Sequence, residues 1–397
     1  MRNPVNESNE PIREDFLPFS QPLIEEEEIN EAIDTLRSGW LTTGPKVKRF
    51  EEEFAEYIES KYAVAINSCT GGLHLSLLAA GIGEGNEVIT TPFTFCATTN
   101  VILHVRAKPV FIDIKPDTFN IDTERIEEAI TPKTKAIMPV HYAGQPCEMS
   151  EIIRIAKRHN LLVIEDAAHA IAAKYKGKRV GTIGDITCFS FYATKNLVTG
   201  EGGMVATDNE KLADKIRVLS LHGMSRDAWK RYSAAGSWYY EVIYPGYKYN
   251  MTDIQASLGL HQLRKLTRLQ KRREEIVEAY NEAFANLDAI EVPFVKPNIE
   301  HAWHLYVIKI VSEKLKFGRN QFIEALRERN IGTSVHFIPV HLHPYYRDTY
   351  GFKKGDFPNA EYVYDRIISL PLYPKMNNKD IEDVIWAVKD IVAKYRR

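Results

Sequence analysis

Short apolar runs alternate with helical stretches between residues 62 and 209, and this alternation constrains the fold more than any other feature. The strand candidates are 63–66, 87–90, 109–114, 136–141, 161–165, 186–192 and 203–207. Helical candidates lie between most of them, at 72–80, 96–105, 123–129 and 149–159. Strands that alternate with helices predict a mostly parallel sheet covered by helices on both faces. Because such sheets bind ligands beyond the carboxyl ends of their strands, the functional residues are expected directly after each strand.

The rest of the chain predicts helices before this region and a second mixed pattern after it. Helical periodicity indicates helices at 26–36 and 47–60. A long helix is expected to begin after Thr252, which has capping-box spacing to Gln255. A strand-like HLYVIKIV, a helix-like RNQFIEALRERN and a final helical segment follow. The predicted organisation is a flexible tail, a large α/β domain and a smaller α+β domain, at 1–15, 16–260 and 261–397.

Composition excludes several classes of protein. Of the 397 residues, 44% are hydrophobic and 26% are charged, which suffices for a large core and excludes a mainly disordered chain. The 51 basic residues are matched by 53 acidic ones, so no basic surplus suggests a nucleic-acid partner. No apolar stretch is long enough to cross a bilayer, and the polar N-terminus lacks the apolar region of a signal peptide. We expect a cytoplasmic protein without a membrane or nucleic-acid partner.

No metal site is expected either. None of the four cysteines belongs to a CxxC pair. His336, His341 and His343 cluster in HFIPVHLHP, but no acid or cysteine accompanies them at the spacing of metal ligands.

Three motifs follow strands of the predicted sheet. The turn NSCTGGL, at 67–73, opens a helix, and its free N–H groups would suit a phosphate, although an ordinary capped turn has the same pattern. Asp166 follows the strand LLVI and could be a metal ligand, a general base, the partner of a ring nitrogen or a helix cap. Phe95, also after a strand, could stack on a ring or pack in the core.

Lys195 is the most informative residue. It leaves the apolar strand CFSFY and enters a polar turn before the glycine-rich GEGG. An ammonium group is costly to desolvate, so this position favours either a side chain in water or a lysine that bonds to an aldehyde. A phosphate turn, an aspartate for a pyridinium nitrogen and a lysine for an aldehyde are together the three anchors that pyridoxal 5′-phosphate (PLP) needs.

With these residues in place, the chain resembles the DegT/StrS-type nucleotide-sugar aminotransferases, which are fold-type I PLP enzymes. The resemblance runs from about Gln21 to the C-terminus. It rests on GWLTTGP, NSCTGGLHLSLLAAGIGEGNEVITTPFTF, PVFIDI, VHYAGQP, IEDAAHA, FSFYATKNLVTGEGGM, YKYNMTDIQASLGLHQL and SLPLYP. It implies an aspartate-aminotransferase-like large domain with a mostly parallel central sheet, and a smaller C-terminal α+β domain.

The resemblance also implies roles for the motif residues. Lys195 would bond to the cofactor and move the proton between substrate and cofactor, and Asp166 would keep the pyridine nitrogen protonated. Phe95 would stack on the ring, and His169 would lie near the phenolic oxygen or the substrate. The phosphate would be held by Thr70, Gly71 and Ser190.

The same family is dimeric, with each active site at the subunit interface. The loop that contains YKYNM would then reach into the partner's site. This chain has Lys248 where the family has an asparagine that contacts the neighbour's phosphate, and Asn250 where it has an arginine. Which of the two residues reaches across is left open. Trp40, Trp238 and His341 are candidate substrate contacts.

The function implied is PLP-dependent amino transfer to a nucleotide-linked keto-deoxysugar, with L-glutamate as the donor and C4 as the favoured carbon. The alternatives are a PLP-dependent sugar dehydratase, an inositol-type aminotransferase and a non-catalytic binding protein on the same fold. Relatives that are dehydratases have a histidine at the lysine position, so Lys195 favours amino transfer.

Overall fold

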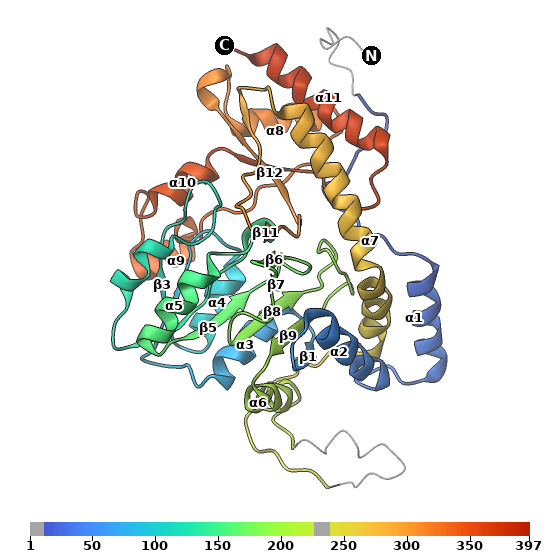
Figure 1. Ribbon diagram of the computed structural model, residues 1–397, viewed down its shortest axis with the longest axis vertical. Coiled ribbons are helices and arrows are strands. Elements are labelled where there is room, and N and C mark those ends of the chain that lie inside the picture. Colours follow the sequence, from blue (N-terminus) through green and yellow to red (C-terminus); the bar gives the residue numbers. More distant parts are fainter. Residues whose placement is uncertain (1–11, 226–238) are drawn as a thin grey trace.

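A seven-stranded sheet forms the centre of the computed structural model, which describes residues 12–225 and 239–397 (Figure 1). The strand order is β1-β9-β8-β5-β4-β2-β3. The strands are β1 (Tyr62–Ile66), β2 (Glu87–Thr90), β3 (Lys108–Phe111), β4 (Thr134–Ile137), β5 (Leu162–Asp166), β8 (Ile186–Ser190) and β9 (Gly203–Thr207). Only β9 is antiparallel to its neighbours. The predicted mostly parallel sheet is confirmed, and each strand candidate contributes one strand.

The central strands are buried on both faces because successive side chains point to opposite sides. In β1, Ala63 and Ala65 face the cluster formed with α2 and the first half of α7, whereas Val64 and Ile66 face α3, α4 and α6. The helices around the sheet are α1 (Glu26–Ser38), α2 (Pro45–Ile58), α3 (Cys69–Ala79), α4 (Cys96–His104), α5 (Met149–His159), α6 (Glu210–Ser220) and α7 (Asp253–Phe284). This packing explains why the strands are continuous apolar runs in the sequence.

A smaller unit packs around an antiparallel sheet in the order β10-β12-β13. The strands of this sheet are β10 (Ile290–Glu291), β12 (Tyr306–Ile310) and β13 (Ile367–Leu370). A third, separate sheet in the order β11-β6-β7 joins β11 (Ile299–Glu300) to β6 (Lys174–Tyr175) and β7 (Lys178–Arg179). The remaining helices are α8 (Arg319–Glu328), α9 (Pro344–Tyr350), α10 (Pro358–Tyr364) and α11 (Asn378–Tyr395). The second half of α7 belongs to the core of this unit, together with α8 and α11.

The long helix α7 therefore spans both units, as Figure 1 shows. It begins at the predicted capping box of Thr252 and Gln255. Its buried side chains up to Leu266 belong to the core of the large part, and those from Ile276 onward belong to the core of the smaller unit. The change of core therefore lies later in the chain than the domain boundary expected after residue 260. Leu17 packs in the core of the smaller unit and pairs with Ile331, so the chain reaches the large part only after this residue.

The helix expected at 123–129 is wrong. The structure has two short 3₁₀ helices there, Thr123–Arg125 and Glu127–Ala129. The segment is too short for a stable α-helix, because Ile130 returns to an extended conformation two residues before Pro132. Further 3₁₀ turns are Tyr142–Gly144, Ser312–Lys314 and Val340–Leu342.

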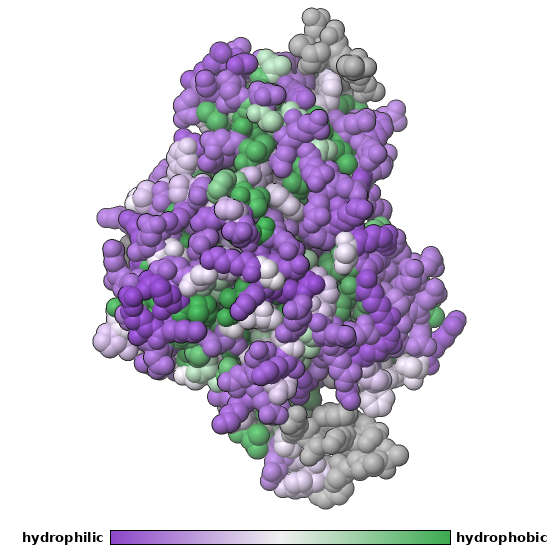
Figure 2. Space-filling view, in the orientation of Figure 1, coloured by the Kyte–Doolittle hydropathy of each residue, from purple (hydrophilic) through white to green (hydrophobic). Residues whose placement is uncertain are grey.

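The surface is mainly hydrophilic on the face shown in Figure 2, with hydrophobic residues gathered in small patches. Within the two described ranges, no helix has both the length and the apolar character that a membrane-crossing helix requires. The expected cytoplasmic location stays a prediction.

Candidate active site

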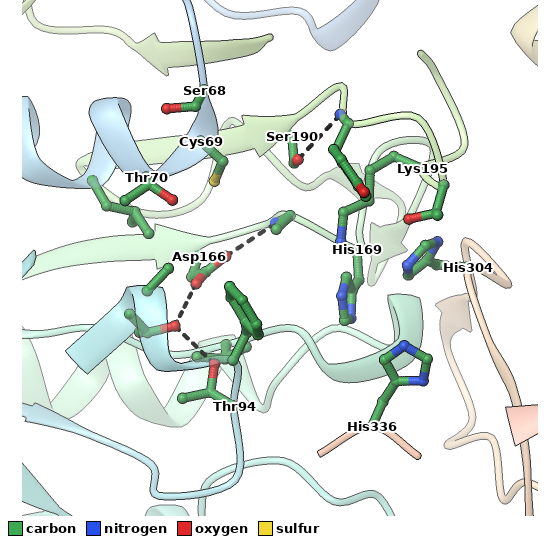
Figure 3. A pocket seen from close by; sticks show the side chains of 18 of the residues that line it. Ser68, Cys69, Thr70, Thr94, Asp166, His169, Ser190, Lys195, His304 and His336 are labelled. Carbon is green, nitrogen blue, oxygen red and sulfur yellow. Dashed lines mark hydrogen bonds between the residues drawn. The ribbon is translucent and has the colours of Figure 1, made fainter. Parts of the chain in front are cut away.

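A cavity of about 500 Å³ opens at the carboxyl ends of β5 and β8. Its walls come from the first turns of α3 and α4, the segments after β5 and β8, and the smaller unit. The structure brings together Thr70, Phe95, Asp166, His169, Ser190 and Lys195 in this cavity. Figure 3 shows Asp166, His169, Ser190 and Lys195 around one space. These residues lie at or soon after strand ends, as the sequence predicted, and their functional roles stay a prediction.

The turn before α3 forms one end of the cavity. Ser68 is the N-cap of α3, and its hydroxyl accepts a hydrogen bond from the Gly71 N–H at 3.0 Å. Thr70 is exposed at the cavity, whereas Gly71 is buried and does not line it. A Cβ atom at Gly203 in β9 would lie 2.6 Å from the Cys69 nitrogen, so only glycine lets the turn approach the sheet this closely. N–H groups at a helix N-terminus, with the hydroxyls of Thr70 and Ser190 nearby, suit an anion such as phosphate.

Asp166 lies at the end of β5 with its carboxylate in the cavity. It accepts hydrogen bonds from the Thr98 hydroxyl at 2.7 Å and from the Ala168 N–H at 3.1 Å. Burial raises the pKa of Asp166, while these two donors and the nearby Lys195 oppose the rise. The neighbouring Glu165 points the other way and is bound by His141, Gly184 and Thr187. Because neighbouring side chains of β5 point to opposite faces of the sheet, Asp166 faces the cavity and Glu165 does not.

Lys195 lies in the turn after β8, where its N–H donates to the Tyr192 carbonyl at 2.8 Å. Burial lowers the pKa of Lys195 from 10.5 to about 8, although Cys69 and Asp166 oppose the shift. A lowered pKa increases the fraction of free amine near neutral pH, and free amine is the nucleophilic form. Lys195 is therefore suited to attack a carbonyl carbon in the cavity.

Phe95 is the N-cap residue of α4, and its side chain is 60% exposed although it lines the cavity. Its ring lies 5.9 Å from that of Phe337, measured between centroids. A large exposed apolar ring at a cavity wall can cover the face of a planar ligand.

Three residues of the smaller unit also line the cavity and were not predicted as site residues: His304, His336 and Phe337. His304 begins the segment that leads into β12. His336 hydrogen-bonds to Ser369 at 2.9 Å, and its carbonyl accepts from the Tyr142 hydroxyl. The motif HFIPVHLHP contains both His336 and His341, and only His341 was predicted to contact the substrate.

Several candidate residues do not reach the cavity within this chain. His341 is fully buried and bonds to Glu361 at 2.9 Å, which contradicts its expected role as a substrate contact. The Trp40 indole donates to the Thr43 carbonyl instead of lining the cavity. Lys248 and Asn250 lie outside the lining as well. Trp238 lies outside the described residues.

The residues present fit PLP. An anion-binding turn, a buried carboxylate, an amine of lowered pKa and an exposed aromatic face meet in one cavity. They match the phosphate, the ring nitrogen, the aldehyde and the ring face of the cofactor. When bound, PLP would supply an electron sink at this position.

Comparisons with known proteins agree with this assignment. Residues 22–389 match the sequence profile of the DegT/DnrJ/EryC1/StrS aminotransferase family. The uncharacterized protein MJ1066 of Methanocaldococcus jannaschii is 64% identical over 97% of this chain and 100% of its own. The spore coat polysaccharide biosynthesis protein SpsC of Bacillus subtilis is 58% identical, over 96% of this chain and 98% of its own.

The solved structures point the same way. Spr1654 of Streptococcus pneumoniae, assigned as a sugar aminotransferase, was solved in its PMP form. It superposes with a TM-score of 0.90 and is 37% identical, over 95% of this chain and 99% of its own. Its PLP form superposes with a TM-score of 0.89. The fold is therefore that of fold-type I aminotransferases. The chain belongs to the DegT/DnrJ/EryC1/StrS aminotransferase family, and the protein is a PLP-dependent sugar aminotransferase.

Proposed function

We propose that the enzyme transfers the amino group of L-glutamate to a keto group of a nucleotide-linked deoxysugar, with C4 as the preferred carbon. The main observation behind this proposal is that Lys195, Asp166 and the turn before α3 line the same cavity, in a chain that belongs to an aminotransferase family. The sequence resemblance supports the nucleotide link, the carbon and the donor. The similarity to SpsC supports a product used in polysaccharide biosynthesis.

Each site residue has a separate task in this reaction. Thr70, Ser190 and the N–H groups of the first turn of α3 hold the phosphate and so fix the position of the ring. Phe95 would cover one face of the ring, and the carboxylate of Asp166 would keep the ring nitrogen protonated. With the cofactor bound, Lys195 would act as the base that removes and returns the proton of the substrate.

The first test is the absorption spectrum of the purified protein with PLP. We expect L-glutamate to abolish the visible band of the bound cofactor and to release 2-oxoglutarate. A UDP-, GDP- or dTDP-linked 4-keto-6-deoxyhexose should then restore the band and yield an aminosugar. A band that ignores glutamate would contradict the donor and favour another donor or dehydration. A protein that binds no PLP would contradict the enzyme assignment.

We further propose a homodimer whose subunits complete each other's active sites. The segment after residue 238 supports this, because Tyr239, Val242 and Ile243 are 59%, 62% and 52% exposed, which is unusual for large apolar side chains so close together. The phosphate turn supports it too. Among the described lining residues, Lys195 is the one lysine or arginine, so a second cation would have to come from outside.

Lys248 is the residue that we propose to supply this cation. It lies on the same segment, and burial lowers the pKa of its ammonium group, while no carboxylate pairs with it among the described residues. Asn250, the other candidate, is already engaged within its own subunit, where its amide donates to the Thr43 hydroxyl at 2.7 Å. A lysine can bind a phosphate as a point charge.

Subunit complementation tests this role. Lys248→Glu should weaken PLP binding by about 10-fold or more, because a charge-assisted contact is lost and a repulsive charge is introduced. Mixed dimers of Lys248→Glu and Lys195→Ala subunits should regain sites of wild-type affinity, since one site then combines Lys195 of one subunit with Lys248 of the other. Binding is measured by absorbance titration. Mixed dimers without any wild-type site would show that Lys248 acts within its own subunit.

A further inference from the structure

Two imidazole rings, those of His169 and His304, form part of the cavity wall beside Lys195 (Figure 3). Their centroids lie 4.3 Å apart, and the ring planes are tilted by 42°. His169 follows β5 in the large part, and His304 precedes β12 in the smaller unit. Both residues are buried. The rings therefore present a fixed polar surface to whatever occupies the cavity next to Lys195.

Both imidazoles are neutral in the folded protein. Burial lowers the pKa of His169 and of His304 well below the usual value, and the positive charge of Lys195 adds to both shifts. The buried guanidinium of Arg273 lowers the pKa of His304 further. A neutral imidazole has one donor and one acceptor nitrogen, so the tautomer decides what each ring offers to a ligand.

The hydrogen bonds fix opposite tautomers for the two rings. The Ala143 N–H donates to His169 Nδ1 at 3.3 Å, so the proton of His169 resides on Nε2. Asn196 donates through its amide nitrogen to the Ala302 carbonyl at 2.6 Å, which identifies its Oδ1 as the atom that faces His304. Oδ1 lies 3.2 Å from His304 Nδ1, so that nitrogen carries the proton and Nε2 of His304 has the lone pair.

Further hydrogen bonds fix the backbone around His304. Arg273 donates to the Trp303 carbonyl at 3.2 Å and to the Leu372 carbonyl at 2.8 Å, which ties the segment before β12 to α7. The His304 N–H also donates to the Ala143 carbonyl at 3.0 Å. Asn196 does not line the cavity, whereas His304 does. The Nδ1 edge of His304 therefore faces the protein, and the Nε2 edge faces the cavity.

We propose that His304 is a specificity-determining residue whose Nε2 accepts a hydrogen bond from a hydroxyl group of the sugar substrate. Asn196 is the positioning residue that fixes the required tautomer. This inference rests on the proposed function and adds that the site recognises a hydroxyl group of the sugar substrate. A hydroxyl can donate to His304 and accept from His169 Nε2–H. The carboxylates of the amino-acid donor only accept hydrogen bonds, so they gain nothing from the lone pair on His304 Nε2.

The two half-reactions separate these possibilities. His304→Phe should raise KM for the nucleotide-linked 4-keto-6-deoxyhexose by about 10- to 100-fold and leave the half-reaction with L-glutamate within about 3-fold of wild type. His304→Gln, which offers an acceptor oxygen, should recover part of the loss. Asn281→Ala is the matched control. Asn281 does not line the cavity, and its side-chain oxygen accepts a hydrogen bond of 2.8 Å from the Tyr306 hydroxyl. Equal losses in both half-reactions would overturn the proposal.

The tautomer is tested without turnover, by ¹⁵N NMR of the full-length protein labelled at histidine. The His304 signals should show a protonated Nδ1 in the wild type and in Asn196→Asp, and a protonated Nε2 in Asn196→Ala. A wild-type His304 protonated on Nε2 would overturn the inference whatever the substrate is. A wild type that has the expected tautomer but aminates no keto-sugar would instead overturn the proposed function, and the hydroxyl assignment with it.

Discussion

Replacing Lys195 with alanine is expected to lower kcat for amino transfer by at least about 10³-fold, because the variant loses both its nucleophile and its proton carrier. No neighbouring side chain can take over these tasks. Among the described residues that line the cavity, Lys195 is the only primary amine, and the nearby His169 has a pKa far below neutrality. Formation of 2-oxoglutarate from L-glutamate measures the loss.

Borohydride reduction followed by mass spectrometry gives a second readout of the same variant. The wild type should retain the mass of the cofactor on the peptide that contains Lys195, and Lys195→Ala should retain none. Lys178→Ala is the matched control, since Lys178 is exposed on β7 and does not line the cavity. Full activity of Lys195→Ala, or cofactor attached to another lysine, would contradict the assignment.

The loss should not come from unfolding. Burial lowers the pKa of Lys195 to about 8, which means that the folded protein disfavours the ammonium form. Removing this group therefore removes a desolvation cost, and the cofactor-free variant should melt at the wild-type Tm or above it. A large drop in Tm would point to a structural role for the lysine.

Sequence reasoning found the residues that follow the strands of the central sheet. Asp166 and Lys195 could be placed because parallel strands bring their carboxyl ends to one edge, and the strands were visible as apolar runs buried on both faces. Thr70 and Phe95 could be placed for the same reason, as they open the helices after β1 and β2. These positions depend on local sequence and on sheet topology alone. Ser190 was selected through the family resemblance, and it lies in the same cavity.

The residues that sequence reasoning missed reach the cavity through long-range packing. His304 arrives there because Arg273 and Asn196, from distant elements, hold its segment in place. The pattern HFIPVHLHP could not distinguish His336 from His341. That choice depends on partners far along the chain, where Glu361 binds His341 inside the protein and Ser369 holds His336 at the cavity.

Asp166→Asn is expected to lower kcat by about 10³-fold while PLP remains bound through Lys195 and the phosphate turn. The asparagine has nearly the same shape but carries no negative charge to hold a proton on the ring nitrogen. The fold can accept it. The Thr98 hydroxyl donates to Asp166 and also lies 2.7 Å from the Thr94 hydroxyl, where either group can be the donor. In the variant, the asparagine amide can donate to Thr98, and Thr98 can then donate to Thr94. Asp185→Asn is the control, because Asp185 accepts from the Val163 N–H at the opposite end of the strands.

A cofactor analogue separates an electrostatic role of Asp166 from a merely structural one. PLP methylated on its ring nitrogen carries a permanent positive charge, and Asp166→Ala leaves room for the methyl group. If Asp166 acts by keeping that nitrogen charged, the analogue should restore a measurable part of kcat in Asp166→Ala and should not improve on PLP in the wild type. If Asp166 only supports the packing around Thr98 and Ala168, both cofactors should be equally poor in the variant. Because burial raises the pKa of Asp166, the protein retains a carboxylate there at an energetic cost, which is reasonable only if a cationic partner offsets that cost.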